Sequence, residues 1–162
     1  AVLNCPIEVN IYYRTPERME ILLSTLEKQQ QQAIALYPKI KEKISRVKLL
    51  GGNPDSRIPN LEGPRANCHS DGILSADTIL VPLEDGDRCE ALITMGKTVC
   101  VIDLNPLSRT AQMASVTIVD ELSRCVQILF ELLEKGTEQI DINWDNKKNL
   151  DQAIQEILQN FN

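Results

Sequence analysis

The hydrophobic pattern of the N-terminal third predicts a strand, a long helix and a second strand. Residues 7–12 alternate between apolar and polar side chains and are rich in β-branched residues, as in a strand. Apolar residues then recur at helical spacing over 19–26, and the glutamine run at 29–32 extends this helix as a solvated surface. We expect a break near Pro38, a short helix after it, and a short strand over 47–50.

The C-terminal half alternates between strands and helices. Continuous apolar runs predict strands that are buried on both faces, at 78–82, 98–102 and 115–119. Helical spacing of apolar residues predicts helices at 87–95, 121–135 and 150–161. This order is typical of a layered α/β fold with a mostly parallel sheet. Because the sequence shows no internal repeat and no dividing linker, we expect residues 1–162 to form a single domain.

A glycine- and proline-rich segment at 51–69 shows no hydrophobic period and is predicted to be a long loop. Long ordered loops are often functional. Arg57 and Arg65 flank Pro59 and could clamp a phosphate or carboxylate, or could pair with acidic residues of the same loop. We take Asn53 and Arg57 as the candidate substrate-binding residues of this segment.

Composition and charge narrow the range of partners. The 162 residues carry 17 basic and 23 acidic side chains, a net charge of -6, which argues against binding nucleic acid or an anionic membrane. A small anionic ligand remains possible because a few local cations can outweigh the mean. No apolar stretch is long enough for a membrane span. The five irregularly spaced cysteines predict reduced, buried thiols in a cytoplasmic protein.

Polar segments follow each of the predicted parallel strands. They lie at 84–88, 103–110 and 120–121. Ligands of open parallel sheets bind beyond the carboxyl ends of the strands, so these segments are the candidate binding site. The alternative is that Asp85, Asp103 and Asp120 act only as turn or helix-capping residues.

The residue types at these strand ends suit a nucleotide. Asp103 could accept hydrogen bonds from ribose hydroxyls. Arg109 and Thr110 could hold phosphate through a guanidinium and a hydroxyl. Glu121 and Leu122 open a predicted helix, whose free N–H groups could receive an anion or a base edge.

Other motifs are absent or weak. Residues 96–98 resemble the end of a P-loop, but Ala91 stands where a glycine is needed and the tripeptide leads into a strand. No Gly-x-Gly-x-x-Gly fingerprint occurs. Cys68 and His69 are adjacent, which is poor geometry for one metal, and no spacing predicts a metal site or identifies a catalytic residue. We expect His69 to be a surface or loop residue.

Longer motifs resemble a known family. Five strings of this sequence resemble archaeal 4-phosphopantoate–β-alanine ligase, or phosphopantothenate synthetase. They are VNIYYRTPER (9–18), NPDSRIPNLEGPR (53–65), VPLEDGDRCEAL (81–92), MGKTVCVIDLNPLSRTAQMASVTIVD (95–120) and WDNKKNLDQAI (144–154). The resemblance spans most of the chain, and its most specific part is the stretch 101–120.

The resemblance implies a fold and a reaction. The fold would be a Rossmann-like three-layer sandwich, and the protein a homodimer. ATP with Mg²⁺ would convert 4-phosphopantoate into an acyl-adenylate, and β-alanine would then give 4-phosphopantothenate, a step of coenzyme A synthesis. The alternative is a non-catalytic nucleotide-binding or regulatory module with the same fold.

The resemblance also implies which residues hold the nucleotide. They are Asp103, Leu104, Asn105, Arg109, Thr110, Glu121 and Leu122, which include the residues that the strand-end argument selects. Glu121 stands where the family typically has Asn; a carboxylate there could accept from an adenine or ribose donor but would repel phosphate. Family members carry a further N-terminal region with nucleotide-binding arginines, which we expect this chain to lack.

Overall fold

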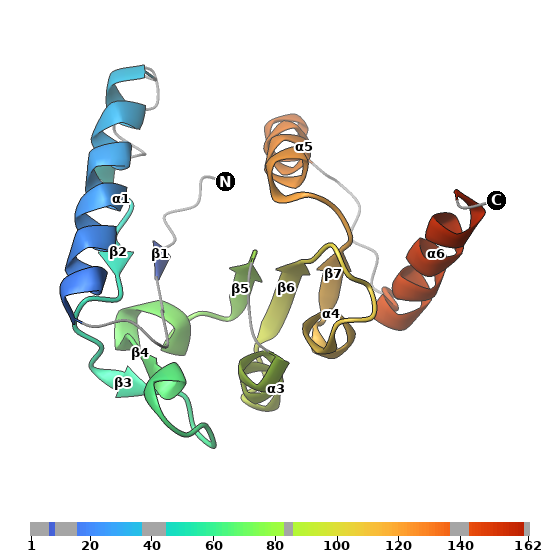
Figure 1. Cartoon of the computed structure of the whole chain (residues 1–162), viewed down its shortest axis with the longest axis horizontal. Coiled ribbons are helices and arrows are strands. Elements are labelled where there is room, and N and C mark those ends of the chain that lie inside the picture. The colour runs from blue at the N-terminus through green and yellow to red at the C-terminus, as the bar shows by residue number, and fades with distance from the viewer. Residues whose placement is uncertain (1–6, 9–15, 37–44, 83–85, 137–142, 161–162) are drawn as a thin grey trace. The chain divides into compact units, whose positions relative to one another are not determined.

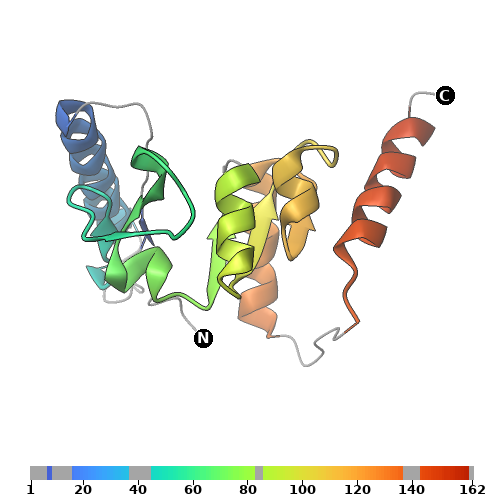
Figure 2. The same cartoon turned by 90° about the horizontal axis from the view of Figure 1, so that it is seen from below.

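A computed structural model describes residues 7–8, 16–36, 45–82, 86–136 and 143–160. The chain divides into two compact units, 1–76 and 77–162, which Figures 1 and 2 show from two directions. We describe each unit by itself. That the whole chain forms a single domain stays a prediction.

The first unit contains one long helix and two small strand pairs. Its elements are α1 (Pro16–Leu36), β1 (Ile7–Glu8), β2 (Leu49–Leu50), β3 (Ser56–Arg57), β4 (Asn67–Cys68) and two helical turns at Pro64–Ala66 and Ser70–Leu74. The strand β1 pairs with β2 in parallel, whereas β3 and β4 are antiparallel. The predicted long helix and the strand near residue 50 are confirmed. Residues 9–12 and Pro38 lie outside the described residues.

The segment 51–69 is not the uniform loop that we predicted. It contains the β3–β4 pair, in which Ser56 lies opposite Cys68 and Arg57 opposite Asn67. Two-residue strands are too short to produce a recognisable alternation of polarity, so this pattern was not detectable. Ile58, just after β3, is 1% exposed and anchors the segment in the first unit.

The second unit is an α/β layer, which confirms the predicted fold class. Its strands are β5 (Thr78–Val81), β6 (Thr98–Ile102) and β7 (Val116–Ile118), all parallel, in the order β5-β6-β7. Its helices are α3 (Gly86–Thr94), α4 (Arg109–Met113), α5 (Leu122–Lys135) and α6 (Asn146–Gln159). Helix α3 packs against β6 and α4, and α6 packs against β7 and α4. The three-layer arrangement stays a prediction.

The core of the second unit follows the predicted strands, with one exception. Fully or nearly buried apolar side chains come from α3, β6 and α4, namely Cys89, Leu92, Val99, Val101 and Ala111. The strand β5 lies at the end of the sheet order, and its Leu80 is 53% exposed. The prediction that all three strands are buried on both faces is therefore wrong for β5.

A polar network joins α6 to the sheet. The side chain of Asn146 accepts a hydrogen bond from the Thr117 N–H at 2.7 Å and donates to the Ala111 and Ala114 carbonyls at 2.9 and 3.1 Å. Thr117 itself is 2% exposed and donates through its hydroxyl to the Ala111 carbonyl at 2.7 Å. Asn146 therefore provides hydrogen-bond partners for backbone groups of β7 and of the α4 region.

The described cysteines are free thiols. Cys68, Cys89 and Cys125 are buried and Cys100 is half-buried. Burial raises the pKa of the Cys100 thiol, which keeps it protonated and unreactive at neutral pH. This agrees with the predicted use of cysteine as a small core residue.

Candidate functional site

The carboxyl ends of the parallel strands border a pocket of about 270 Å³. The three strand arrows point to the same edge of the sheet in Figure 1. The pocket is lined by Pro82, Val101, Ile102, Asp103, Leu104, Asp120, Glu121 and Leu122. Of the predicted nucleotide-binding residues, Asp103, Leu104, Glu121 and Leu122 therefore come together in one place.

Asp103 organises the loop that leaves β6. Its carboxylate accepts hydrogen bonds from the Asn105 N–H at 2.9 Å and from the Ser108 hydroxyl at 2.5 Å. The Ser108 oxygen in turn accepts from the Ala111 N–H at 2.9 Å and caps α4. Asp103 thus has the turn-forming role that the sequence left open, and it also lines the pocket. Leu104, 70% exposed, forms an apolar part of the wall.

Glu121 caps the N-terminus of α5 with its own side chain. The carboxylate accepts from the Ser123 and Arg124 N–H groups at 3.0 and 3.2 Å, and these bonds hold the pKa of Glu121 below its usual range. We expected free N–H groups at this helix start, but those of Ser123 and Arg124 are occupied by a carboxylate of the same chain. The helix start therefore already carries the negative charge that its dipole favours.

Asp120 lines the pocket and belongs to the strand-end segment 120–121, for which helix capping was the alternative to ligand binding. Its carboxylate accepts from the Glu121 N–H at 2.7 Å and from the Arg124 guanidinium. The bond to Arg124 is the main reason that the pKa of Asp120 lies below its usual range. Its position two residues after β7 is the strand-end signal that placed the segment 120–121 among the candidates. With Asp103 and Glu121, it makes the pocket lining acidic.

Arg109 does not line the pocket. Its guanidinium donates to Asp87 through Nη1 and to Glu90 through Nη2, the latter at 2.6 Å, so that it joins α4 to α3. These two carboxylates, Glu90 first, raise the pKa of Arg109 above its usual value. Thr110 is 6% exposed inside α4, and neither it nor Asn105 is among the pocket residues. Glu90 could not be identified from sequence spacing because it lies 19 residues from its partner Arg109.

Asn53 and Arg57 belong to the first unit. The Arg57 guanidinium donates to the Asn67 side chain at 2.8 Å and to the Gly63 carbonyl at 3.2 Å. These bonds close the segment between β3 and β4. Asn53 is exposed. A substrate-binding role for Asn53 and Arg57 stays a prediction.

Comparison with known proteins decides the family. A family model described as phosphopantothenate/pantothenate synthetase matches residues 1–160. The chain belongs to the phosphopantothenate/pantothenate synthetase family. The match includes both units, and therefore both the strand-end pocket and the segment that contains Asn53 and Arg57.

Several archaeal members of the synthetase family are similar to this chain, and each is named 4-phosphopantoate–β-alanine ligase. The protein of Thermococcus kodakarensis is 45% identical over 130 residues, which is 80% of this chain and 44% of that protein. The protein of Thermococcus onnurineus is 40% identical over 94% of this chain and 56% of its own length. The protein of Methanosarcina mazei is 38% identical over 96% of this chain and 58% of its own length. The chain thus spans about half the length of these relatives.

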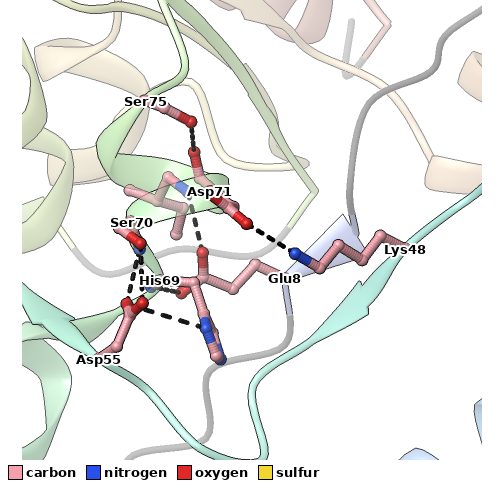
Figure 3. A network of polar contacts seen from close by, with 9 residues as sticks. Glu8, Lys48, Asp55, His69, Ser70, Asp71 and Ser75 are labelled. Atoms are coloured by element: carbon pink, nitrogen blue, oxygen red, sulfur yellow. Dashed lines mark hydrogen bonds and ion pairs between the residues drawn. The ribbon is translucent and has the colours of Figure 1, made fainter.

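The first unit of this synthetase-family chain contains a second polar cluster. Figure 3 shows the carboxylates of Glu8 and Asp55 directed at the turn that follows β4. Glu8 accepts from the His69 and Ile73 N–H groups at 3.0 and 2.9 Å, and Asp55 accepts from the Ser70 N–H and hydroxyl, both at 2.7 Å. The Ser70 bonds hold the pKa of Asp55 below its usual range.

His69 lies in this turn, as predicted, but its side chain is only 15% exposed. Its Nδ1 atom is 4.0 Å from the Asp55 carboxylate. That distance is too long for a hydrogen bond.

Two further observations concern the described residues alone. Within them, no group of three or more His, Cys, Asp or Glu side chains is arranged to hold a metal ion. None of their helices is both long and apolar enough to cross a membrane.

Proposed function

We propose that the protein serves the ligation of 4-phosphopantoate with β-alanine to form 4-phosphopantothenate, in the synthesis of coenzyme A. The observation that carries this proposal is the family match over residues 1–160, together with relatives named 4-phosphopantoate–β-alanine ligase. The pocket at the carboxyl ends of β5, β6 and β7 supports it, because open parallel sheets bind their ligands there.

We further propose that the strand-end pocket receives the nucleoside part of ATP. Leu104 and Leu122 offer apolar contacts to a base, and the carboxylates of Asp103 and Asp120 can accept hydrogen bonds from ribose hydroxyls or an exocyclic amine. Phosphates are poorly suited to the same pocket, because its lining is acidic and Glu121 already occupies N–H groups of α5. The triphosphate, with Mg²⁺, is therefore expected to extend out of the pocket.

The proposed chemistry requires orientation and charge rather than a protein nucleophile. A carboxylate oxygen of 4-phosphopantoate attacks the α-phosphorus of ATP, and pyrophosphate leaves. The amine of β-alanine then attacks the carbonyl carbon of the acyl-adenylate, loses a proton, and displaces AMP. Holding the two reactants in line supplies much of the rate, since a bound pair reacts as if at high effective concentration. No described side chain needs to form a covalent bond with the substrate.

The assembly that the resemblance implies and the location that the cysteines imply are also proposals. We propose a homodimer in the cytoplasm. Light scattering after size-exclusion chromatography measures the mass directly, and a mass of one chain would contradict the dimer.

The decisive assay follows the products. Purified protein is incubated with MgATP and with 4-phosphopantoate, β-alanine, both or neither, and AMP and 4-phosphopantothenate are measured. The proposal predicts both products in equal amounts only when both substrates are present. ATP that is bound but left intact in all four mixtures would instead indicate a non-catalytic nucleotide-binding module.

A further inference from the structure

Arg109 is held in place by three residues of α3, namely Gly86, Asp87 and Glu90. Nη1 of its guanidinium donates to Asp87, and Nη2 donates to Glu90 at 2.6 Å. Asp87 and Glu90 are three residues apart on α3 and therefore lie on one face of that helix. Their carboxylates engage one terminal nitrogen each, which fixes the plane of the guanidinium as well as its position.

Gly86 provides the space for the stem of this side chain. A Cβ atom added at Gly86 would lie 2.7 Å from Cγ, 2.8 Å from Cδ and 3.0 Å from Cβ of Arg109. Side-chain atoms essentially never approach so closely, so any larger residue at position 86 would push the stem of Arg109 away. The backbone of α3 at Gly86 and the two carboxylates thus favour the same conformation of the Arg109 side chain.

The side chains of this cluster are exposed, so their ion pairs add little to the stability of the fold. The side chains of Arg109, Asp87 and Glu90 are 59%, 37% and 48% exposed. Exposed ion pairs contribute little to folding, because water and salt screen them and long side chains lose entropy on pairing. The main effect of the two ion pairs is instead to hold the Arg109 guanidinium in one place.

The location of the cluster connects it with the strand-end pocket. Gly86 begins α3, after β5, and Arg109 begins α4, after β6. Both helix starts therefore lie at the carboxyl edge of the sheet, where Pro82, Asp103 and Leu104 line the pocket. The guanidinium has five N–H donors, so the two carboxylate bonds leave others for a ligand.

We propose that Gly86, Asp87 and Glu90 are positioning residues that hold Arg109 ready to bind the phosphates of the nucleotide. This proposal rests on the proposed function, because it assumes that the pocket binds ATP. The carboxylates do not touch the ligand. They act through Arg109, which would otherwise sample many rotamers and lose entropy when it met a phosphate.

The test compares phosphate-dependent with phosphate-independent affinity. Asp87→Ala, Glu90→Ala and Gly86→Ala are titrated with MgATP and with adenosine, and Asp151→Ala on α6 is the control for loss of an exposed carboxylate. We expect ATP affinity to fall by about fivefold to tenfold in the three variants, the scale of one weakened charge-assisted hydrogen bond. Adenosine affinity should stay unchanged, as should both affinities in the control.

A double-mutant cycle separates positioning from general damage. In an Arg109→Ala background, Asp87→Ala should cause no further loss of ATP affinity, because the group that it positions is gone. An additional loss in that background would overturn the proposal. So would an unchanged ATP affinity in Asp87→Ala, or a gain, which would mean that the carboxylates compete with phosphate for Arg109.

The same titrations distinguish this proposal from the proposed function. A protein that binds ATP but forms no AMP with both substrates would contradict the ligase activity alone, and the titrations would still decide the role of Asp87. A wild-type protein that binds no ATP would overturn both. Circular dichroism of each variant checks that the fold is retained.

Discussion

Removal of the Asn146 side chain should strongly destabilise the second unit. Its amide nitrogen donates to the carbonyls of Ala111 and Ala114 at 2.9 and 3.1 Å, and its oxygen accepts from the Thr117 N–H at 2.7 Å. Three hydrogen bonds at about 1 kcal/mol each give about 3 kcal/mol. Because Thr117 is 2% exposed, the Thr117 N–H would also lose its partner in the interior. We therefore expect Asn146→Ala to lower the free energy of unfolding by about 2–4 kcal/mol.

Urea denaturation followed by tryptophan fluorescence measures this loss. Trp144 is the only tryptophan of the chain and lies two residues before Asn146, so its emission reports on this part of the second unit. The matched control is Asn160→Ala, at the exposed end of the same helix, for which we expect a change below about 0.5 kcal/mol. A loss below about 0.5 kcal/mol in Asn146→Ala would refute the reasoning that these bonds hold α6 on the sheet.

Three further predictions follow from burial and charge. Leu92 is 0% exposed, so Leu92→Ala should cost about 2–5 kcal/mol in urea denaturation, whereas Leu158→Ala, at a 53% exposed site, should cost under about 1 kcal/mol; equal losses would contradict the assigned core. The pKa of Asp120 is lower in the folded protein than the unfolded value near 3.8. The stabilisation that the ionised Asp120 carboxylate gives to the fold is therefore complete above the unfolded pKa and is lost as the pH falls through the folded pKa. The stability difference between wild type and Asp120→Asn should therefore be constant at neutral pH and shrink only below about pH 4 in acid titrations; a difference that vanishes already at about pH 6 would contradict this. A Cβ at Gly72 would lie 2.2 Å from the Glu8 carboxylate, so Gly72→Ala should speed amide exchange over residues 69–75, and unchanged exchange would show that Glu8 does not cap this turn.

Sequence patterns located the regular elements best where apolar side chains make the contacts. The strand β6 (Thr98–Ile102) coincides with its predicted range, and α5 begins one residue after its predicted start. Helix α6 begins at Asn146, four residues earlier than predicted. Its start is held by hydrogen bonds that the Asp145 side chain accepts from the Lys148 N–H and the Asn146 side chain accepts from the Thr117 N–H, instead of by apolar contacts. Helix α4 (Arg109–Met113) was missed because five residues are too few to show a helical period.

The sequence predicted those parts of the candidate site that the order of strands and helices determines. Asp103 and Glu121 each lie close to the carboxyl end of a parallel strand, so the order of the elements was enough to bring them to one pocket. The direction of the Arg109 side chain was not predictable in this way. It depends on the packing of α3 against α4 and on carboxylates 19 and 22 residues away, which no local spacing reveals.

The central claim is that the strand-end pocket binds the nucleotide. Calorimetric titration of MgATP into the wild type, Leu104→Asp and Leu107→Asp tests it most directly. Both leucines are exposed on the loop after β6, at 70% and 64%, but only Leu104 lines the pocket. We predict saturable binding to the wild type, a loss of about tenfold or more in Leu104→Asp, and a change within about twofold in Leu107→Asp. No binding to the wild type, or equal losses in the two variants, would contradict it.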